Sequence, residues 1–174
     1  MTRTMTTRTM TTRTRTVLGA LLLAAQATLV GCSGFALQPP EHFVQLEEPD
    51  WSGFALRTVN ADGVVLGVRE VDNAARGSLT FWIEAIRNRL RTVRGYALLD
   101  ERPVKAASGE AGHQLRLGRD EGSQAYDYWV TIFVTPPGLV SDGQVLVVEA
   151  GGRREEFARV EDALGRAIDG FELE

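Results

Sequence analysis

The stretch that most constrains the fold of this 174-residue chain is YDYWVTIFV, residues 126–134. Side chains of a β-strand alternate between its two faces, so this stretch places Val130 on one face and Trp129 and Phe133 on the other. An antiparallel strand with one solvated face carries apolar residues on the other face only. Apolar groups on both faces therefore predict a central strand of a sheet that is covered on two sides.

Further strands are predicted on both sides of this central one. Residues 54–71 contain two alternating apolar runs around Asn60-Ala61-Asp62-Gly63, a composition typical of a hairpin turn. The other predicted strands, which bring the total to about six, are residues 96–106, 113–119 and 143–150. Short turns join most of these segments, so the sheet is expected to be antiparallel.

Two helices are predicted from apolar residues at three- and four-residue spacing, which fall on one stripe of a helix. In the first, Ser78 is the expected N-cap and Gly95 the expected C-cap. The second begins at Arg153 and stops near Gly170. Their predicted apolar stripes are Leu79, Trp82, Ile83, Ile86, Leu90 and Val93 in the first helix, and Phe157, Val160, Leu164, Ile168 and Phe171 in the second.

Together these elements predict an α+β fold, an α/β/α sandwich in which two helices cover an antiparallel sheet. The hairpin FALRTVNADGVVLGVRE, the helix GSLTFWIEAIRNRL, the strand GYALL and the late strand VLVVEAG resemble the PsbP-like superfamily, which includes DcrB-like bacterial envelope lipoproteins. The resemblance covers about residues 43–171. It implies an accessory or adaptor role at a membrane, and it supplies no catalytic motif.

The first 31 residues have the features of a bacterial signal peptide. Residues 1–16 carry four arginines and no acidic residue, and Met5 and Met10 fit as start sites as well as Met1 does. Residues 17–30 are almost wholly apolar, but they are shorter than the roughly 20 residues that span a bilayer. We therefore expect this segment to direct export and to be removed.

The cluster Leu29-Val30-Gly31-Cys32 resembles a lipobox, in which the cysteine receives diacylglycerol before the signal peptide is cut. Cys32 is the single cysteine of the chain and would become the first residue. Two or three acyl chains, palmitate among them, would anchor the protein durably. The expected organisation is a signal peptide at 1–31, a lipidated tether at 32–40 and a domain at 41–174. Ordinary secretory cleavage after Ala36 is the alternative.

The net charge of the mature chain and its predicted location limit the partners that we expect. Without the four leader arginines the chain holds 15 basic and 23 acidic residues, a net charge of −8, which argues against nucleic acid. Ser33, and not aspartate, follows the cysteine. By similarity to well-studied envelope lipoproteins, this favours the periplasmic face of the outer membrane.

We predict no catalytic, metal or cofactor site. The two histidines, His42 and His113, lie far apart in the sequence, and the lone Cys32 is assigned to lipid, so a tetrahedral nitrogen and sulfur site cannot form. Neither histidine belongs to a Gly-x-Ser-x-Gly motif. Arg87, Arg91 and Arg94 share one flank of the first helix and form a candidate partner-binding sector. The alternative for these arginines is a solvated helix edge.

The preferred function is that of a non-catalytic accessory, adaptor or assembly factor that binds another envelope protein. The rival hypothesis is a small-ligand carrier or an enzyme with a cleft between sheet and helix, in which Arg94, His113 and Tyr128 would contribute. A third hypothesis is a structural subunit of a surface complex, which would expose an apolar patch of several hundred Å².

Overall fold

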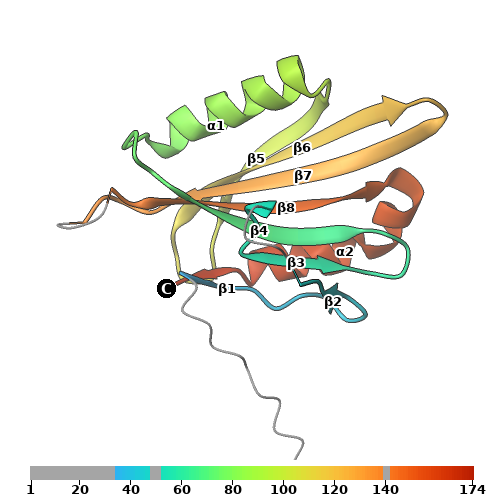
Figure 1. Ribbon diagram of the computed structural model, residues 1–174, viewed down its shortest axis with the longest axis horizontal. Coiled ribbons are helices and arrows are strands. Elements are labelled where there is room, and N and C mark those ends of the chain that lie inside the picture. Colours follow the sequence, from blue (N-terminus) through green and yellow to red (C-terminus); the bar gives the residue numbers. More distant parts are fainter. Residues whose placement is uncertain (1–33, 48–51, 139–141) are drawn as a thin grey trace, which may run out of the picture. The chain divides into compact units, whose positions relative to one another are not determined.

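The computed structural model describes residues 34–47, 52–138 and 142–174. In chain order (Figure 1), the elements are β1 (Phe35–Ala36), β2 (Val44–Gln45), β3 (Leu56–Val59), β4 (Val65–Asp72), α1 (Leu79–Asn88), the π-helical turn η2 (Arg89–Val93), β5 (Ala97–Lys105), β6 (Ala111–Glu121), β7 (Gln124–Val134), β8 (Gln144–Arg153), α2 (Arg154–Asp169) and β9 (Glu172–Leu173).

The described residues form a seven-stranded antiparallel sheet in the order β2-β3-β4-β8-β7-β6-β5, with α1 and α2 on opposite faces (Figure 1). This confirms the predicted α+β architecture. β7 lies inside the sheet between β6 and β8, and its Trp129 and Phe133 belong to a different hydrophobic cluster from its Val130 and Ile132. The two-faced pattern of residues 126–134 therefore identified a central strand correctly.

The predicted hairpin consists of β3 and β4, and its turn has a local cause. The Asn60 side-chain oxygen accepts hydrogen bonds from the backbone N–H groups of Asp62 at 3.1 Å and Val64 at 2.8 Å. Gly63 has a φ of 81°, a left-handed conformation that glycine adopts without steric cost. The register that follows pairs Val59 with Val65.

α1 begins as predicted but ends differently. The Ser78 hydroxyl accepts a hydrogen bond from the Phe81 N–H, as an N-cap does, and Gly95 has a φ of 72° just after the helical segment. In η2 the Arg94 N–H reaches the Arg89 carbonyl, a wider turn than in an α-helix. The wider turn shifts the following residues around the helix axis. Val93, which was predicted to pack with the stripe, is 72% exposed.

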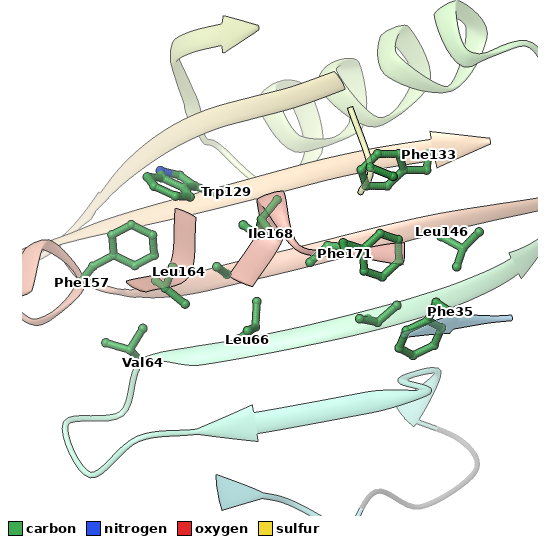
Figure 2. Packing of buried hydrophobic residues seen from close by; sticks show 14 residues of the cluster. Phe35, Val64, Leu66, Trp129, Phe133, Leu146, Phe157, Leu164, Ile168 and Phe171 are labelled. Atoms are coloured by element: carbon green, nitrogen blue, oxygen red, sulfur yellow. The ribbon is translucent and has the colours of Figure 1, made fainter. Parts of the chain in front are cut away.

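α2 ends at Gly170 as predicted, and it closes its face of the sheet. Phe157, Leu164 and Ile168 are buried, and Phe171 turns into the same core just after the helix. Figure 2 shows these side chains against residues of β4, β7 and β8. Trp129 meets Phe157 edge to face at a centroid distance of 5.1 Å.

Two predictions at the N-terminal side need correction. The sheet has seven strands instead of about six, because β2 pairs with β3 at the edge. The predicted tether at 32–40 is not free over the part that the structure describes, since β1 pairs with β9. Phe35 is 6% exposed and stacks on Phe171 at 5.7 Å, so hydrophobic burial ties this segment to the domain.

Candidate functional site

The candidate site is a groove of about 580 Å³ on the α1 face, which we call the α1-side groove. It lies beside α1, which packs on β6 and β7, and it extends over the same face of β4 and β8. Of the floor residues, Val71 is exposed, whereas Val145 and Val147 are buried. The floor is formed by Val71, Val130, Val145 and Val147, and the helical wall by Trp82, Ile86 and Leu90. The accessible lining is divided about equally between polar and apolar surface, and the volume is typical of small-molecule binding sites.

The two ends of the groove differ in chemistry. Val71 pairs with Val145 near the start of β8, whereas Tyr128 pairs with Gly151 near its end. Trp82 lies at the first end, because its indole N–H donates to the Asn73 side chain, two residues after Val71. We call this first end, made of Val71, Val145 and Trp82, the valine end.

The opposite end is cationic and aromatic. The Tyr96 and Tyr128 rings lie 5.2 Å apart, and the Arg119 guanidinium lies 5.9 Å from the Tyr96 ring centroid. Arg94 lines the groove two residues before Tyr96. We call this part, made of Arg94, Tyr96, Arg119 and Tyr128, the arginine end.

The arginines around the groove differ in how they are paired. Arg69 binds the Glu149 carboxylate at 3.1 Å and the Ser52 carbonyl at 2.8 Å, and its guanidinium lies 3.5 Å from the Phe54 ring centroid. Arg119 lies 3.6 Å from Glu121, whose side chain is 65% exposed.

Two further guanidinium groups lack such partners. No carboxylate of the described residues lies within ion-pair distance of Arg89 or Arg94. Among the described lining residues, the four arginines face one carboxylate, that of Glu149. The groove is therefore locally positive in a chain whose formal net charge is −4.

Tyr128 supplies a neutral hydroxyl at the arginine end. Burial, followed by the charge of the Glu149 carboxylate and its hydrogen bond, raises the pKa of Tyr128 well above its ordinary value. The phenol therefore stays protonated throughout the physiological range. It is not positioned as a general base.

Asn73 fixes the helical wall of the groove. This residue is 1% exposed, and its side-chain oxygen accepts hydrogen bonds from the Gly77 N–H at 2.9 Å and the Trp82 indole N–H at 2.9 Å. Its side-chain N–H donates to the Gly77 carbonyl at 3.0 Å. A fully bonded buried amide holds the start of α1 and the Trp82 ring in one orientation.

His113, the histidine of the rival hypothesis, lies outside the groove. Its Nε2 is 3.3 Å from a Glu101 oxygen, and Arg87 of α1 binds the same carboxylate. The Arg87 hydrogen bond, with a smaller contribution from His113, holds the pKa of Glu101 below its ordinary value, although partial burial opposes the shift. This cluster ties α1 to β5 and β6, and the structure does not bring His113 to Arg94 or Tyr128.

The three arginines of the predicted partner-binding sector lie in different surroundings. Arg87 is engaged with Glu101, Arg94 lines the groove, and Arg91 lines a separate hollow beside the start of β5. Sequence reasoning missed Arg69 and Arg119 as site residues. Strand alternation could have identified Arg119. It follows Leu117 by two residues in β6, so both side chains lie on the face of the sheet that α1 packs on.

Several predicted features lie outside the residues that the structure describes. These are the signal peptide, the lipobox residues Leu29, Val30 and Gly31, and the lipidation candidate Cys32. Within the described ranges, neither α1 nor α2 is both long and apolar enough to cross a membrane. The same ranges contain no group of three or more His, Cys, Asp or Glu residues placed to hold a metal.

The hypothesis of a structural subunit predicted a large exposed apolar patch. The exposed large apolar residues of the described ranges come from five separate elements: β2, β4, α1, η2 and β5. They are Val44, Val71, Phe81, Val93 and Leu99. Val71 is the one of these that lines the α1-side groove.

No protein-family model and no curated protein matches the sequence. Solved structures do match the fold. Cyanobacterial PsbP (CyanoP) from Synechocystis is 12% identical with a TM-score of 0.62, covering 81% of this chain and 87% of that one.

Two further structures match at similar coverage. LpqN, involved in cell envelope biogenesis of Mycobacterium tuberculosis, is 16% identical with a TM-score of 0.62, covering 80% and 82% of the two chains. A variant of the protein Mog1 is 14% identical with a TM-score of 0.55, covering 83% and 93%. At these identities the likeness concerns the fold alone, and it confirms that the chain contains a domain with a PsbP-like fold.

Proposed function

We propose that this chain is a membrane-anchored, non-catalytic accessory protein of the bacterial cell envelope, which acts by binding an anionic partner in the α1-side groove. The observation that carries the proposal is the groove itself, an apolar floor beside guanidinium groups that lack carboxylate partners among the described residues. Arginine is well suited to recognise carboxylates and phosphates, because its planar guanidinium donates several hydrogen bonds at once.

A binding role agrees better with these residues than an enzymatic one. A general base must lie within hydrogen-bond reach of the reacting group. His113 lies away from the groove beside Glu101, and the raised pKa of Tyr128 keeps its proton on the phenol. The groove supplies donors and apolar contacts, which are the means of holding a partner.

The envelope location rests on the sequence and on one structural neighbour. The leader, the apolar segment and the lipobox-like cluster before Cys32 occur in the order that lipoprotein export requires. The neighbour LpqN is itself involved in cell envelope biogenesis. We extend this location to attachment of the mature chain through acyl chains on Cys32 at the periplasmic face of the outer membrane.

A cross-linked pull-down from bacterial envelopes tests the proposal, with the intact chain compared with Cys32→Ala and Arg94→Glu. Arg91→Glu is the matched control, since it makes the same charge change in an exposed arginine of the same helical segment outside the groove. The intact chain and Arg91→Glu should capture the same partner, and the other two variants should lose it. Equal capture by Arg94→Glu and Arg91→Glu would remove the groove from the function.

A further inference from the structure

We propose that the occupant of the α1-side groove is a single-chain anionic amphiphile. Its headgroup lies at the arginine end, and its hydrocarbon chain lies along the floor towards the valine end. This inference rests on the proposed function and names the ligand of its site. The first argument is the order of the lining. The valine end and the arginine end lie at opposite ends of the groove, as the two halves of an amphiphile do, and Arg69, which pairs with Val147 between them, is engaged with Glu149.

The valine end suits a hydrocarbon chain. Val145 is 1% exposed, whereas Val71, its partner in the strand pairing, is 45% exposed although it lies on a sheet face. Burying the exposed apolar surface beside Trp82 and Val71 against a chain is favourable by the hydrophobic effect. The volume of about 580 Å³ falls within the range of about 300–1,000 Å³ that small-molecule sites occupy.

The arginine end suits a carboxylate or phosphate headgroup. Among the described residues, no carboxylate lies within ion-pair distance of Arg94, and Arg119 is paired with the exposed Glu121 at 3.6 Å. The Glu149 carboxylate, which would repel an anion, is neutralised by Arg69 at 3.1 Å. The anionic group is therefore expected to lie beyond Glu149, near Arg94 and Arg119.

The start of the described chain lies at the same end of the sheet as the valine end. The Gly34 N–H donates to the Glu70 carboxylate at 3.1 Å, and Glu70 precedes Val71 in β4. Gly34 follows Cys32 by two residues, which span at most about 7 Å. Glu70 pairs with Leu146 of the α2-side core, so the described chain begins at this end of the sheet but on the face opposite to the groove.

The test uses the full chain with Cys32→Ser, titrated calorimetrically with laurate, dodecyl phosphate and dodecyl maltoside below their micelle concentrations. All three probes contain twelve chain carbons, of which the last is the carboxyl carbon in laurate, and they differ in the headgroup. We expect one site per chain for laurate and dodecyl phosphate, and binding of the uncharged maltoside that is weaker by at least about tenfold. The tighter of the two anions identifies a carboxylate or a phosphate as the natural headgroup.

Two matched pairs of variants locate this binding. Arg94→Glu and Val71→Glu should weaken laurate binding by at least about tenfold, whereas Arg91→Glu and Val44→Glu should change it less than about twofold. All four positions are exposed, and urea midpoints close to that of the parent chain would show that each variant folds. Equal binding of all three probes, equal loss in both members of a pair, or no binding would each overturn the inference.

Different experimental outcomes would disprove the inference and the proposed function. If no amphiphile binds but Arg94→Glu still abolishes capture of a protein partner, the groove is a docking site for an acidic protein segment. The proposed function then stands, and the inference is wrong. If the amphiphiles bind as expected but capture does not depend on Arg94 or Cys32, the ligand assignment stands and the accessory role fails.

Discussion

The two faces of the sheet are covered in different ways. On the α2 face, Phe157, Leu164 and Ile168 of the helix are buried among side chains of β4, β7 and β8 (Figure 2). On the α1 face, none of the residues of α1 is fully buried, although the helix has a clear apolar stripe. α2 therefore closes a core, whereas α1 forms one wall of a groove.

This difference separates stability from function in physical terms. Large stabilisation requires that apolar side chains be removed from water, and the α2 face does this with a large buried cluster that includes Phe157, Leu164 and Ile168. The α1 face buries sheet residues such as Leu115 and Val145, but it keeps Val71 and the arginines of the groove accessible, which is unfavourable for the isolated domain and useful for binding. Substitutions on the two faces should therefore have different consequences.

The largest expected effect is on the closed face. Phe157→Ala removes a side chain that is 1% exposed and meets Trp129 edge to face, so it should lower the free energy of unfolding by about 3–5 kcal/mol. Phe81→Ala makes the same change in α1, where the ring is 49% exposed and contacts Trp82, and should cost about 1 kcal/mol. Urea denaturation measures both. Similar losses would contradict the distinction between the two faces.

The next effect concerns the contact that holds α1 in place. Asn73→Ala leaves the Gly77 N–H and the Trp82 indole N–H without their acceptor and should cost about 1–3 kcal/mol. Hydrogen exchange should quicken across α1 and stay unchanged in α2. Asn88→Ala, at an exposed position of the same helix, is the control and should leave both helices unaffected.

A smaller effect is expected at the N-cap of α1. Ser78→Ala removes the acceptor of the Phe81 N–H and should lower stability by about 1 kcal/mol. Ser78→Asp supplies another acceptor and should restore most of the loss. Chemical denaturation of the three proteins under one set of conditions gives the comparison, and an unaffected Ser78→Ala protein would contradict the capping role.

The smallest expected effect is a pH dependence of the stability, which comes from Glu101 on the α1 side. Because Arg87 lowers the pKa of Glu101 in the folded state, the Glu101 contribution is fully present above the ordinary carboxyl value of 4.5 and is lost as the pH falls through the lowered pKa. The stability difference between the parent chain and Glu101→Gln should therefore shrink below pH 4.5. Unfolding measured across this range checks the sign. A difference that grows towards acid would contradict it.

Local sequence patterns were sufficient to predict the turn of the hairpin and the elements whose apolar residues recur with the period of a strand or a helix. Residues 126–134 identified the central strand, Asn60 and Gly63 marked the hairpin turn, and the apolar spacing outlined α2. β1 and β2 have two residues each, too few for any periodicity to register. β1 forms by pairing with β9, which is distant in the sequence, and β2 forms by pairing with β3 at the edge of the large sheet.

The candidate site was predicted less completely than the fold, because it depends on strand order. α1 carries the chain away from β4, and the last long strand, β8, returns to pair with β4. This arrangement brings Arg69 of β4 onto the same groove as Arg119 of β6. Alternation along a strand predicts on which face of the sheet an arginine side chain lies. It does not predict which strand lies beside it or over which strands α1 packs.

The most direct test of the account is photo-crosslinking of the otherwise intact chain in bacterial envelopes. A photoreactive amino acid at Val71, in the groove, is compared with one at Ala158, on the exposed surface of α2. The account predicts that the photoreactive amino acid at Val71 forms an adduct with the occupant of the groove, and that this adduct disappears with Arg94→Glu. It predicts no adduct at Ala158. Adducts at Ala158 alone, or equal adducts at both positions, would contradict the assignment of binding to the α1 face.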